Sequence, residues 1–397
     1  MKKNLDKKIE EVLTKSVETV LPSKKSLKET LKKRKIRLYL GVDPTSPKLH
    51  LGHTVPLRKL KEFQELGHEA ILLFGTFTAQ IGDPSDRDEA RKPLNPNQVR
   101  ENMATYKSQA SKILDFSKTK IKFNGDWLAK LNFKDVIKLA SNFTVSRLLE
   151  RDMFQKRLKE GKEVWVNEFL YPLLQGYDSV AMNVDLEIGA TDQTFNILVG
   201  RKLQEIYNKK EKFVLTTPML IGLDGRKMSK TYNNTVNLTD SSSEMYGKIM
   251  SLKDNFIVHY LQLTTSLPLK EIEKIEYNLK NKKINPIEAK ARLAKEIVMT
   301  FHGEKEAFSA EKEFNKIFRN KGLPSSIPEK KIKNKKIRIL DLLVETGLVF
   351  SKSEAKRMIL QKGVKIDSIV QERWDEVVEI KKGEIIQVGK RKFVKLL

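Results

Sequence analysis

The chain has 397 residues, enough for two or three domains with a sizeable buried core. It contains no cysteine, which excludes disulfides, cysteine–zinc sites, iron–sulfur clusters and a thiol nucleophile. No apolar run reaches the roughly 18 residues that a membrane span needs, so we expect a cytoplasmic protein without a membrane partner. A net charge of +25 favours nucleic acid, acidic membranes or phosphorylated substrates as partners, although a lysine-biased composition gives the same excess.

The first elements along the chain predict a parallel sheet. Residues 36–43 (IRLYLGVD) and 69–76 (EAILLFGT) are short apolar runs typical of buried strands. Residues 54–67, between them, have the apolar spacing of a helix and end at a glycine. Strand, helix and strand at this length form a βαβ unit, whose two strands run parallel.

The same order returns further along, with a strand at 184–190, a helix at 191–208 and a strand at 212–220. We therefore expect an α/β fold: a doubly wound, parallel-sheet, Rossmann-like catalytic domain over residues 1–235. The stretch at about 95–177 predicts a helical insertion into this domain.

The second half of the chain predicts smaller units. Residues 236–320 have helical periodicity throughout, which indicates an all-α domain. Residues 321–336 are rich in Pro, Ser and Lys and predict a linker. Residues 337–397 predict two short helices followed by strands, a small α+β module, in which Ser351 and Glu354 form a capping box for the second helix.

The motif DPTSPKLHLGHT, residues 43–54, places His50 and His53 where the first strand has ended and a helix begins. Ligands bind beyond the carboxyl ends of such strands, where helix N-termini attract anions. Neutral imidazole N–H groups suit phosphate oxygens, and Gly52 permits close backbone approach. Metal binding is an alternative, but the chain has five histidines and no zincin-like spacing; a buried core role is disfavoured by the polar surroundings.

A second motif, GLDGRKMSKTYNN at residues 222–234, carries Lys227 and Lys230 in a loop rich in Gly and Asn. Lysine is a strong point charge for phosphate. The loop alone is weak evidence, because lysine-rich loops are usually solvated surface, and it lacks the spacing of a Walker A loop.

In this order, HLGH and KMSKT resemble the two nucleotide-binding signatures of class I aminoacyl-tRNA synthetases. From about Leu31 to its end the chain resembles the bacterial tyrosyl-tRNA synthetases, in the subgroup whose first signature reads DPT-x-P-x-LHLGH. The resemblance implies a tyrosine–tRNA ligase, which activates L-tyrosine with ATP to tyrosyl-adenylate and pyrophosphate and then transfers tyrosine to the 3′ end of its tRNA. Thr231, Ala190 and Asp86 depart from the usual Ser, Gly and Gly of the family.

The resemblance also implies partners and cofactors. It implies Mg²⁺ carried by the ATP phosphates, no dedicated protein metal site, and a homodimer formed through the helical insertion. It further implies that residues 236–320 bind the anticodon arm of the tRNA.

Amino-acid specificity is expected to lie in FLYPLLQGYDSV, residues 169–180, where Tyr171, Gln175 and Asp178 share one helix face. That face could instead be solvent-exposed. By resemblance, Tyr171, Gln175 and Asp83 hold the substrate ammonium group, while an ionised Asp178 and Tyr39 bond the phenol hydroxyl. Tyr39 and Asp178 argue against the related tryptophan enzymes, although position 39 varies within the subgroup.

The resemblance assigns the other site residues. It gives catalytic roles to Thr45, His50, His53, Lys227 and Lys230, and ATP binding to Gly41, Asp43, Gly52, Gly189, Asp192, Gln193, Met228 and Ser229. Asp192 would accept from the ribose, although a helix-capping role suits it equally.

The tail, GLVFSKSEAKRMILQKGVKID at 347–367, resembles the alpha-L RNA-binding module of a small-subunit ribosomal protein and of pseudouridine synthases. Lys352, Lys356 and Arg357 are the predicted RNA contacts, although three charges on one helix are more often a solvated face. A non-catalytic RNA-binding protein should have lost signature residues, and an RNA-modifying enzyme would not explain the two nucleotide motifs.

Overall fold

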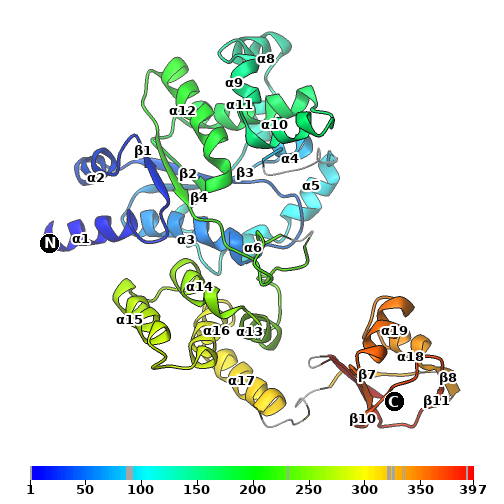
Figure 1. Cartoon of the computed structure of the whole chain (residues 1–397). Coiled ribbons are helices and arrows are strands. Elements are labelled where there is room, and N and C mark those ends of the chain that lie inside the picture. The colour runs from blue at the N-terminus through cyan, green and yellow to red at the C-terminus, as the bar shows by residue number, and fades with distance from the viewer. Residues whose placement is uncertain are drawn as a thin grey trace. The chain divides into compact units, whose positions relative to one another are not determined.

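The computed structural model describes residues 2–85, 93–229, 232–319, 323, 327–332, 334, 336–389 and 392–397. The chain forms two compact units, residues 1–307 and residues 308–397 (Figure 1). Among the described residues, no helix is long and apolar enough to cross a membrane.

The first unit is built on a six-stranded sheet of order β1-β6-β5-β2-β3-β4. Strands β2 to β6 run parallel, and β1 pairs antiparallel with β6 at one edge. The chain enters the middle of the sheet at β2, moves outward to β4, and returns beside β2 with β5, which confirms the doubly wound fold. The strands are β1 (Thr19–Leu21), β2 (Arg37–Val42), β3 (Glu69–Phe74), β4 (Thr119–Phe123), β5 (Leu186–Ala190) and β6 (Phe213–Thr217).

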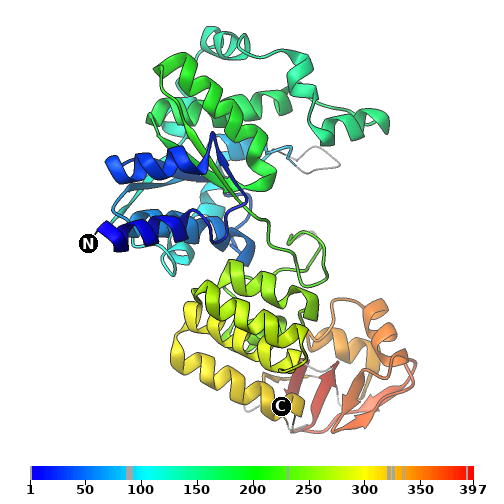
Figure 2. The ribbon, with the colours of Figure 1, turned by 60° about the vertical axis from the view of Figure 1, so that its left-hand side comes forward.

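Helices cover both faces of this sheet. Figures 1 and 2 show α3 on one face and α11 and α12 on the other. A Cβ on Gly176 of α11 would lie 3.0 Å from the backbone nitrogen of Gly200 in α12, so the two helices pack at backbone distance. The helices of this part are α1 (Lys2–Val12), α2 (Lys24–Lys33), α3 (Leu51–Glu65), α4 (Thr78–Ile81), α5 (Pro96–Met103), α6 (Tyr106–Ala110), α7 (Gly125–Leu128), α8 (Phe133–Ala140), α9 (Val145–Leu149), α10 (Asp152–Lys159), α11 (Val166–Met182), the 3₁₀ turn η1 (Thr191–Gln193) and α12 (Thr194–Asn208).

Two edge strands differ from the sequence-based expectation. The stretch predicted as a helical insertion at 95–177 is not helical throughout, because it contributes β4 beside β3. Lysines alternate with apolar residues along β4, as is common at a sheet edge, and this hides the strand in an otherwise helical region. Strand β1 was not predicted, since three residues carry too little periodicity.

Residues 242–302 are helical, as predicted, and belong to the first unit, where α14 contacts α3. Asn285 caps α16 by accepting from the Ile287 N–H (2.9 Å). The elements are α13 (Ser242–Met250), η2 (Asp254–Phe256), α14 (Ile257–Thr264), α15 (Leu269–Lys280) and α16 (Pro286–His302); α17 (Glu304–Phe314) spans the division between the two units, and the π-helical turn η3 (Asn315–Arg319) belongs to the second.

The second unit has its own apolar core beneath α18 and α19. Its main sheet has the order β10-β9-β12-β13-β7, and β11 pairs with β8. Part of the predicted linker at 321–336 belongs to this unit, because β7 pairs with β13 and Ile332 lies in the core. The elements are β7 (Glu329–Lys330), β8 (Lys336–Arg338), α18 (Ile339–Glu345), α19 (Lys352–Leu360), β9 (Val364–Ile366), β10 (Ile369–Val370), β11 (Val377–Glu379), β12 (Ile385–Val388) and β13 (Lys392–Leu396).

Candidate active site

His50 and His53 form the N-terminus of helix α3, which begins three residues before the predicted start. Nδ1 of His50 accepts from the Gly52 N–H (3.2 Å), and the His50 N–H donates to Nδ1 of His53 (3.2 Å). An imidazole whose Nδ1 accepts a hydrogen bond carries its own hydrogen on Nε2. This capping box therefore sets both rings in the tautomer whose Nε2–H is a donor.

The two sequence motifs meet at this helix. Two backbone hydrogen bonds of 2.9 Å join residues 49–51 to residues 236–238, in an antiparallel bridge centred on His50 and Asn237. The segment that follows the second motif is thus fixed to the start of α3.

Met228 brings the second motif itself onto α3. A Cβ on Gly52 would lie 3.9 Å from the Met228 sulfur and 3.0 Å from the His50 ring. Only glycine leaves room for the ring at this position. In this structure the groups that approach Gly52 closely are the side chains of His50 and Met228.

Asn234 organises the loop of the second motif. Its buried amide donates to Asp224 Oδ1 (2.7 Å) and to the Lys227 carbonyl (3.0 Å), and its oxygen accepts from the Ser229 N–H (2.8 Å). A hydrogen bond from Asn234, together with others, lowers the pKa of Asp224 to about 2. One side chain therefore sets the backbone on both sides of Met228.

The Lys227 side chain contacts a residue that follows strand β5. Its Nζ lies 2.8 Å from Oδ2 of Asp192, which stands directly beyond the end of β5. Lys230 and the departures Thr231 and Asp86 lie outside the described residues. The pair joins a predicted phosphate ligand to the predicted ribose ligand.

Asp43, at the end of β2, is held by two hydroxyl donors. Tyr171 donates to Oδ2 (2.9 Å) and Thr78 to Oδ1 (2.7 Å), while Asn124 donates to the Thr78 oxygen (2.9 Å). A Cβ on Gly75 would fall 1.8 Å from Asp43 Oδ1, so this arrangement requires glycine there. Tyr171 therefore faces Asp43 in this structure.

Asp178 is buried, with 2% of its surface exposed, and accepts two N–H groups. The Trp127 indole donates to Oδ1 (2.8 Å) and the Asn124 amide to Oδ2 (3.2 Å). Burial raises the pKa of the Asp178 carboxyl well above its usual range, and these two donors oppose the shift. The alternative, that this helix face is exposed to solvent, is therefore wrong for Asp178.

Asp83, Gln193 and Gln175 are joined through Asn196. Gln193 donates to Asp83 Oδ2 (2.7 Å), and the Asn196 amide lies 3.2 Å from Gln193 Oε1 and 3.0 Å from Gln175 Oε1. Asn196 is fully buried, and its own Oδ1 meets no donor in the part of the chain described. Residues predicted separately for tyrosine and ATP thus share one polar cluster.

Tyr39 is fully buried, and its hydroxyl pairs with the Ser179 hydroxyl at 3.0 Å. Burial, with the Glu187 and Asp178 carboxylates nearby, raises the pKa of the Tyr39 hydroxyl well above its usual value. The structure therefore brings Tyr39 close to Asp178 and keeps its hydroxyl protonated.

Thr45, Gly41 and Gly189 complete the predicted set. The Thr45 N–H donates to the Asp43 carbonyl (2.8 Å) in the turn after β2, and Gly41 is exposed within β2. A Cβ on Gly189 would lie 2.7 Å from Ile197 Cδ1, so glycine allows β5 to pack against α12.

Sequence reasoning missed the side chains that hold these groups. Most of them lie outside the quoted motifs, and the pattern of the motifs did not single out Ser179 or Asn234 within them. Asn124 follows a strand that the helical pattern concealed. One signal was present: a glutamate inside the apolar strand 184–190 must find a partner when it is buried. The missed residues are Thr78, Asn124, Trp127, Ser179, Glu187, Asn196, Lys212 and Asn234.

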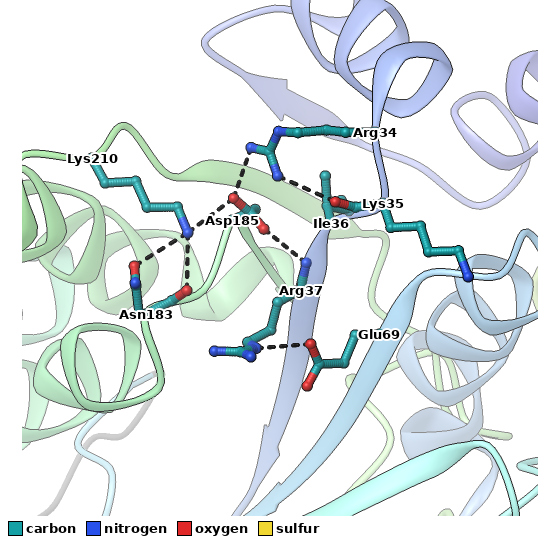
Figure 3. A pocket seen from close by; sticks show the side chains of 8 residues that line it. All are labelled: Arg34, Lys35, Ile36, Arg37, Glu69, Asn183, Asp185 and Lys210. Carbon is teal, nitrogen blue, oxygen red and sulfur yellow. Dashed lines mark hydrogen bonds and ion pairs between the residues drawn. The ribbon is translucent and has the colours of Figure 1, made fainter.

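A surface pocket lies elsewhere in the first unit, lined by residues at the start of three strands. Figure 3 shows it at the amino ends of β2, β3 and β5, the opposite edge from the site above. Both of its carboxylates are already paired, Asp185 with Arg34 (2.8 Å) and Lys210 (2.9 Å), and Glu69 with Arg37 (3.0 Å). We therefore assign the chemistry to the carboxyl edge, where α/β sheets bind ligands.

In the second unit, Lys352, Lys356 and Arg357 are exposed on α19. Lys352 pairs with Asp341 (2.5 Å), and the Lys356 ammonium lies 3.8 Å from the ring centre of Trp374. Ser351 caps the helix, as predicted, by accepting from the Glu354 N–H (3.2 Å). The three cations share one helix, and two of them, Lys352 and Lys356, are held by different neighbours.

Comparison with known proteins defines the class. The family model described as tRNA synthetases class I (W and Y) matches residues 31–319. A solved C-terminally truncated mitochondrial tyrosyl-tRNA synthetase of Coccidioides posadasii is 26% identical, with a TM-score of 0.63, over 78% of this chain and 91% of that one. A tyrosyl-tRNA synthetase of Archaeoglobus fulgidus, solved with L-tyrosine, shares the fold at 23% identity (TM-score 0.63; 77% and 99% covered).

Full-length relatives are more similar. A tyrosine–tRNA ligase of Thermotoga maritima is 49% identical over 97% of this chain and 96% of its own. One of Carboxydothermus hydrogenoformans is 46% identical over 98% and 97%. The chain belongs to the tyrosine–tRNA ligase family of class I tRNA synthetases.

Proposed function

We propose that the carboxyl ends of β2 and β5 form the active site through which this chain works as a tyrosine–tRNA ligase. The chain activates L-tyrosine with ATP to tyrosyl-adenylate and pyrophosphate, and transfers tyrosine to the 3′ end of its tRNA. The observation that carries the site assignment is the bridge between residues 49–51 and 236–238. It fixes both nucleotide motifs at one helix N-terminus, a position suited to phosphate.

The part of the site that binds tyrosine offers hydrogen-bond acceptors to the substrate. Asp83, Gln175 and Tyr171 supply oxygens for the substrate ammonium group. Asp178 and Tyr39, both buried, meet the phenol hydroxyl. Phenylalanine would leave these polar groups unpaired in a desolvated pocket, which costs more than the lost hydrogen bond itself.

The ATP side uses donors at the phosphates and an acceptor at the ribose. Asp192 accepts from a ribose hydroxyl, and Lys227, 2.8 Å from it, is close enough to bind the attached phosphates. ATP arrives as its Mg²⁺ complex. Phosphate ligands are Thr45, His50, His53, Lys227 and Lys230, and backbone around the nucleotide comes from Gly41, Asp43, Gly52, Gly189, Gln193, Met228 and Ser229.

The chemistry needs no side-chain nucleophile. The tyrosine carboxylate attacks the α-phosphorus, the bond to the bridging oxygen breaks, and pyrophosphate leaves. A ribose hydroxyl of the tRNA then attacks the tyrosyl carbonyl and AMP leaves. The Nε2–H groups of His50 and His53 and the Lys227 ammonium stabilise charge that builds on the transferring phosphoryl group and on pyrophosphate.

The tRNA meets basic surfaces in both units. The helices of residues 236–320 bind the anticodon arm, and the module at 337–397 binds RNA through Lys352, Lys356 and Arg357. All three cations are exposed and so can reach phosphates.

The chain works as a homodimer in the cytoplasm. Support for the dimer comes from apolar side chains that face outward in the helical insertion, in particular Phe133 (80% exposed) and Val166 (75%). Large apolar surface exposed to solvent is a feature of protein interaction sites.

His50→Asn keeps an N-cap acceptor but removes the imidazole donor. We expect kcat of tyrosine-dependent ATP–pyrophosphate exchange to fall roughly 100-fold, with KM for tyrosine nearly unchanged, because the ring acts on the transition state. The exposed change Glu65→Ala in the same helix should have no effect. A raised KM for tyrosine with kcat intact would contradict the assigned role.

Asp178→Asn should lower kcat/KM for tyrosine about 100-fold and that for phenylalanine much less, because only tyrosine pairs with the carboxyl. Pyrophosphate exchange with each amino acid, and with tryptophan as competitor, measures this ratio. The exposed Asp126→Asn is the matched control. Equal losses for tyrosine and phenylalanine would show that Asp178 does not read the phenol.

Replacing Lys352, Lys356 and Arg357 by alanine should raise KM for tRNA about tenfold at physiological salt, since three phosphate contacts are lost. Pyrophosphate exchange without tRNA should be unchanged. The control variant loses the same three positive charges, through replacement of the exposed lysines Lys7, Lys8 and Lys25 by alanine. Loss of both activities, or equal effects of the two triple variants, would refute the RNA contact.

Phe133→Glu combined with Val166→Glu should convert the dimer to a monomer, because two charges would be buried in an apolar interface. Sedimentation velocity measures the change, with Leu5→Glu on the exposed face of α1 as control. A wild-type chain that sediments as a monomer would overturn the dimer proposal directly.

A further inference from the structure

A buried ion pair lies directly beneath the tyrosine side of the site. The side chains of Glu187, in β5, and Lys212, just before β6, are 2% and 0% exposed and contact each other. A Cβ on Gly200 would fall 2.6 Å from the Lys212 nitrogen, so glycine leaves space for the ammonium group. Two charges removed from water rarely add stability compared with apolar residues, which points to a role in positioning.

Glu187 faces Gln175, a proposed ligand of the substrate ammonium group. The Gln175 amide nitrogen donates to Glu187 Oε1 at 3.1 Å. A carboxylate can only accept, so it selects the NH₂ end of the amide. The Gln175 carbonyl oxygen is therefore turned the other way, where it accepts from the Asn196 amide (3.0 Å).

The other oxygen of Glu187 orders the phenol end of the pocket. Ser179 accepts from Lys212 (2.9 Å) and donates to Glu187 Oε2 (3.3 Å). The Ser179 hydroxyl also pairs with the Tyr39 hydroxyl at 3.0 Å, so Glu187 and Lys212 hold the neighbour of Tyr39.

We propose that Glu187, held by Lys212, is a positioning residue that makes Gln175 present its carbonyl oxygen to the ammonium group of tyrosine. The proposal rests on the proposed function, in which Gln175 binds that group. A neutral partner at 187 can donate as well as accept, so Gln175 could rotate and turn its NH₂ toward the cation. The substrate ammonium would then lose an acceptor and face a donor.

The test compares two ligands that differ only at the ammonium group. L-Tyrosine carries it, and 3-(4-hydroxyphenyl)propionate lacks it. In the full-length double variant Glu187→Gln with Lys212→Met, we expect the Kd for tyrosine to rise about tenfold, as for one lost hydrogen bond to a charged group. The Kd for the propionate should stay within about twofold. Calorimetric titration without ATP gives both values.

A second buried pair supplies the matched control. Arg157 and Glu168 are 1% and 4% exposed in their side chains and lie 2.6 Å apart. Arg157→Met with Glu168→Gln neutralises a pair of similar burial and should leave the ratio of the two Kd values unchanged. Equal weakening of both ligands by the Glu187 variant, or no weakening of tyrosine, would overturn the positioning role.

Gln175→Met tests the proposed ammonium site separately from the positioning role of Glu187. If Gln175→Met changes the Kd for tyrosine and the Kd for the propionate equally, the proposed ammonium site itself is wrong. If Gln175→Met discriminates and the Glu187 double variant does not, only the role of Glu187 fails. Should the double variant not fold, Glu187→Gln alone, which retains an acceptor for Lys212, gives the same comparison.

Discussion

Two backbone hydrogen bonds, between residues 49–51 and residues 236–238, are the constraint on which this site depends. They join the turn after β2 to a segment almost two hundred residues later. Without them, the imidazoles at the start of α3 and Lys227 of the second loop would belong to unrelated surfaces. With them, donors from both motifs lie beside the carboxyl ends of β2 and β5, where the strand order reverses.

The polar groups at this edge are ordered before any substrate arrives. Asn124 uses both amide hydrogens, one for Asp178 and one for Thr78, and Thr78 passes its own hydrogen to Asp43. A second chain of contacts runs from Asp83 to Glu187 through Gln193, Asn196 and Gln175. Networks of this kind hold acceptors at fixed positions in a low-dielectric interior, so little reorganisation accompanies binding.

The sequence was sufficient for the four inner strands of the sheet and for naming the residues that resemble family motifs. Apolar runs locate β2, β3, β5 and β6, because central strands are buried on both faces. It was insufficient for β1 and β4, which lie at edges and are short or interrupted by lysine. The same limit applies to Lys212, whose partner Glu187 lies on another strand, and to Asn234, whose partners depend on the conformation of its own loop.

The tautomers of His50 and His53 show a further limit, since a motif names the ring while the capping box decides which nitrogen donates. Motifs carry residue identity. Hydrogen-bond direction depends on the surrounding backbone, and this determines whether a group can donate to phosphate or only accept.

The indole of Trp127 makes the intrinsic fluorescence of the chain sensitive to the proposed phenol subsite. The chain has three tryptophans, and Trp127 donates its N–H to Asp178 at 2.8 Å, at the proposed phenol subsite. A ligand that engages this carboxylate alters the hydrogen bond and the local polarity felt by the ring. Intrinsic emission therefore follows occupancy of the pocket in real time, with no label attached.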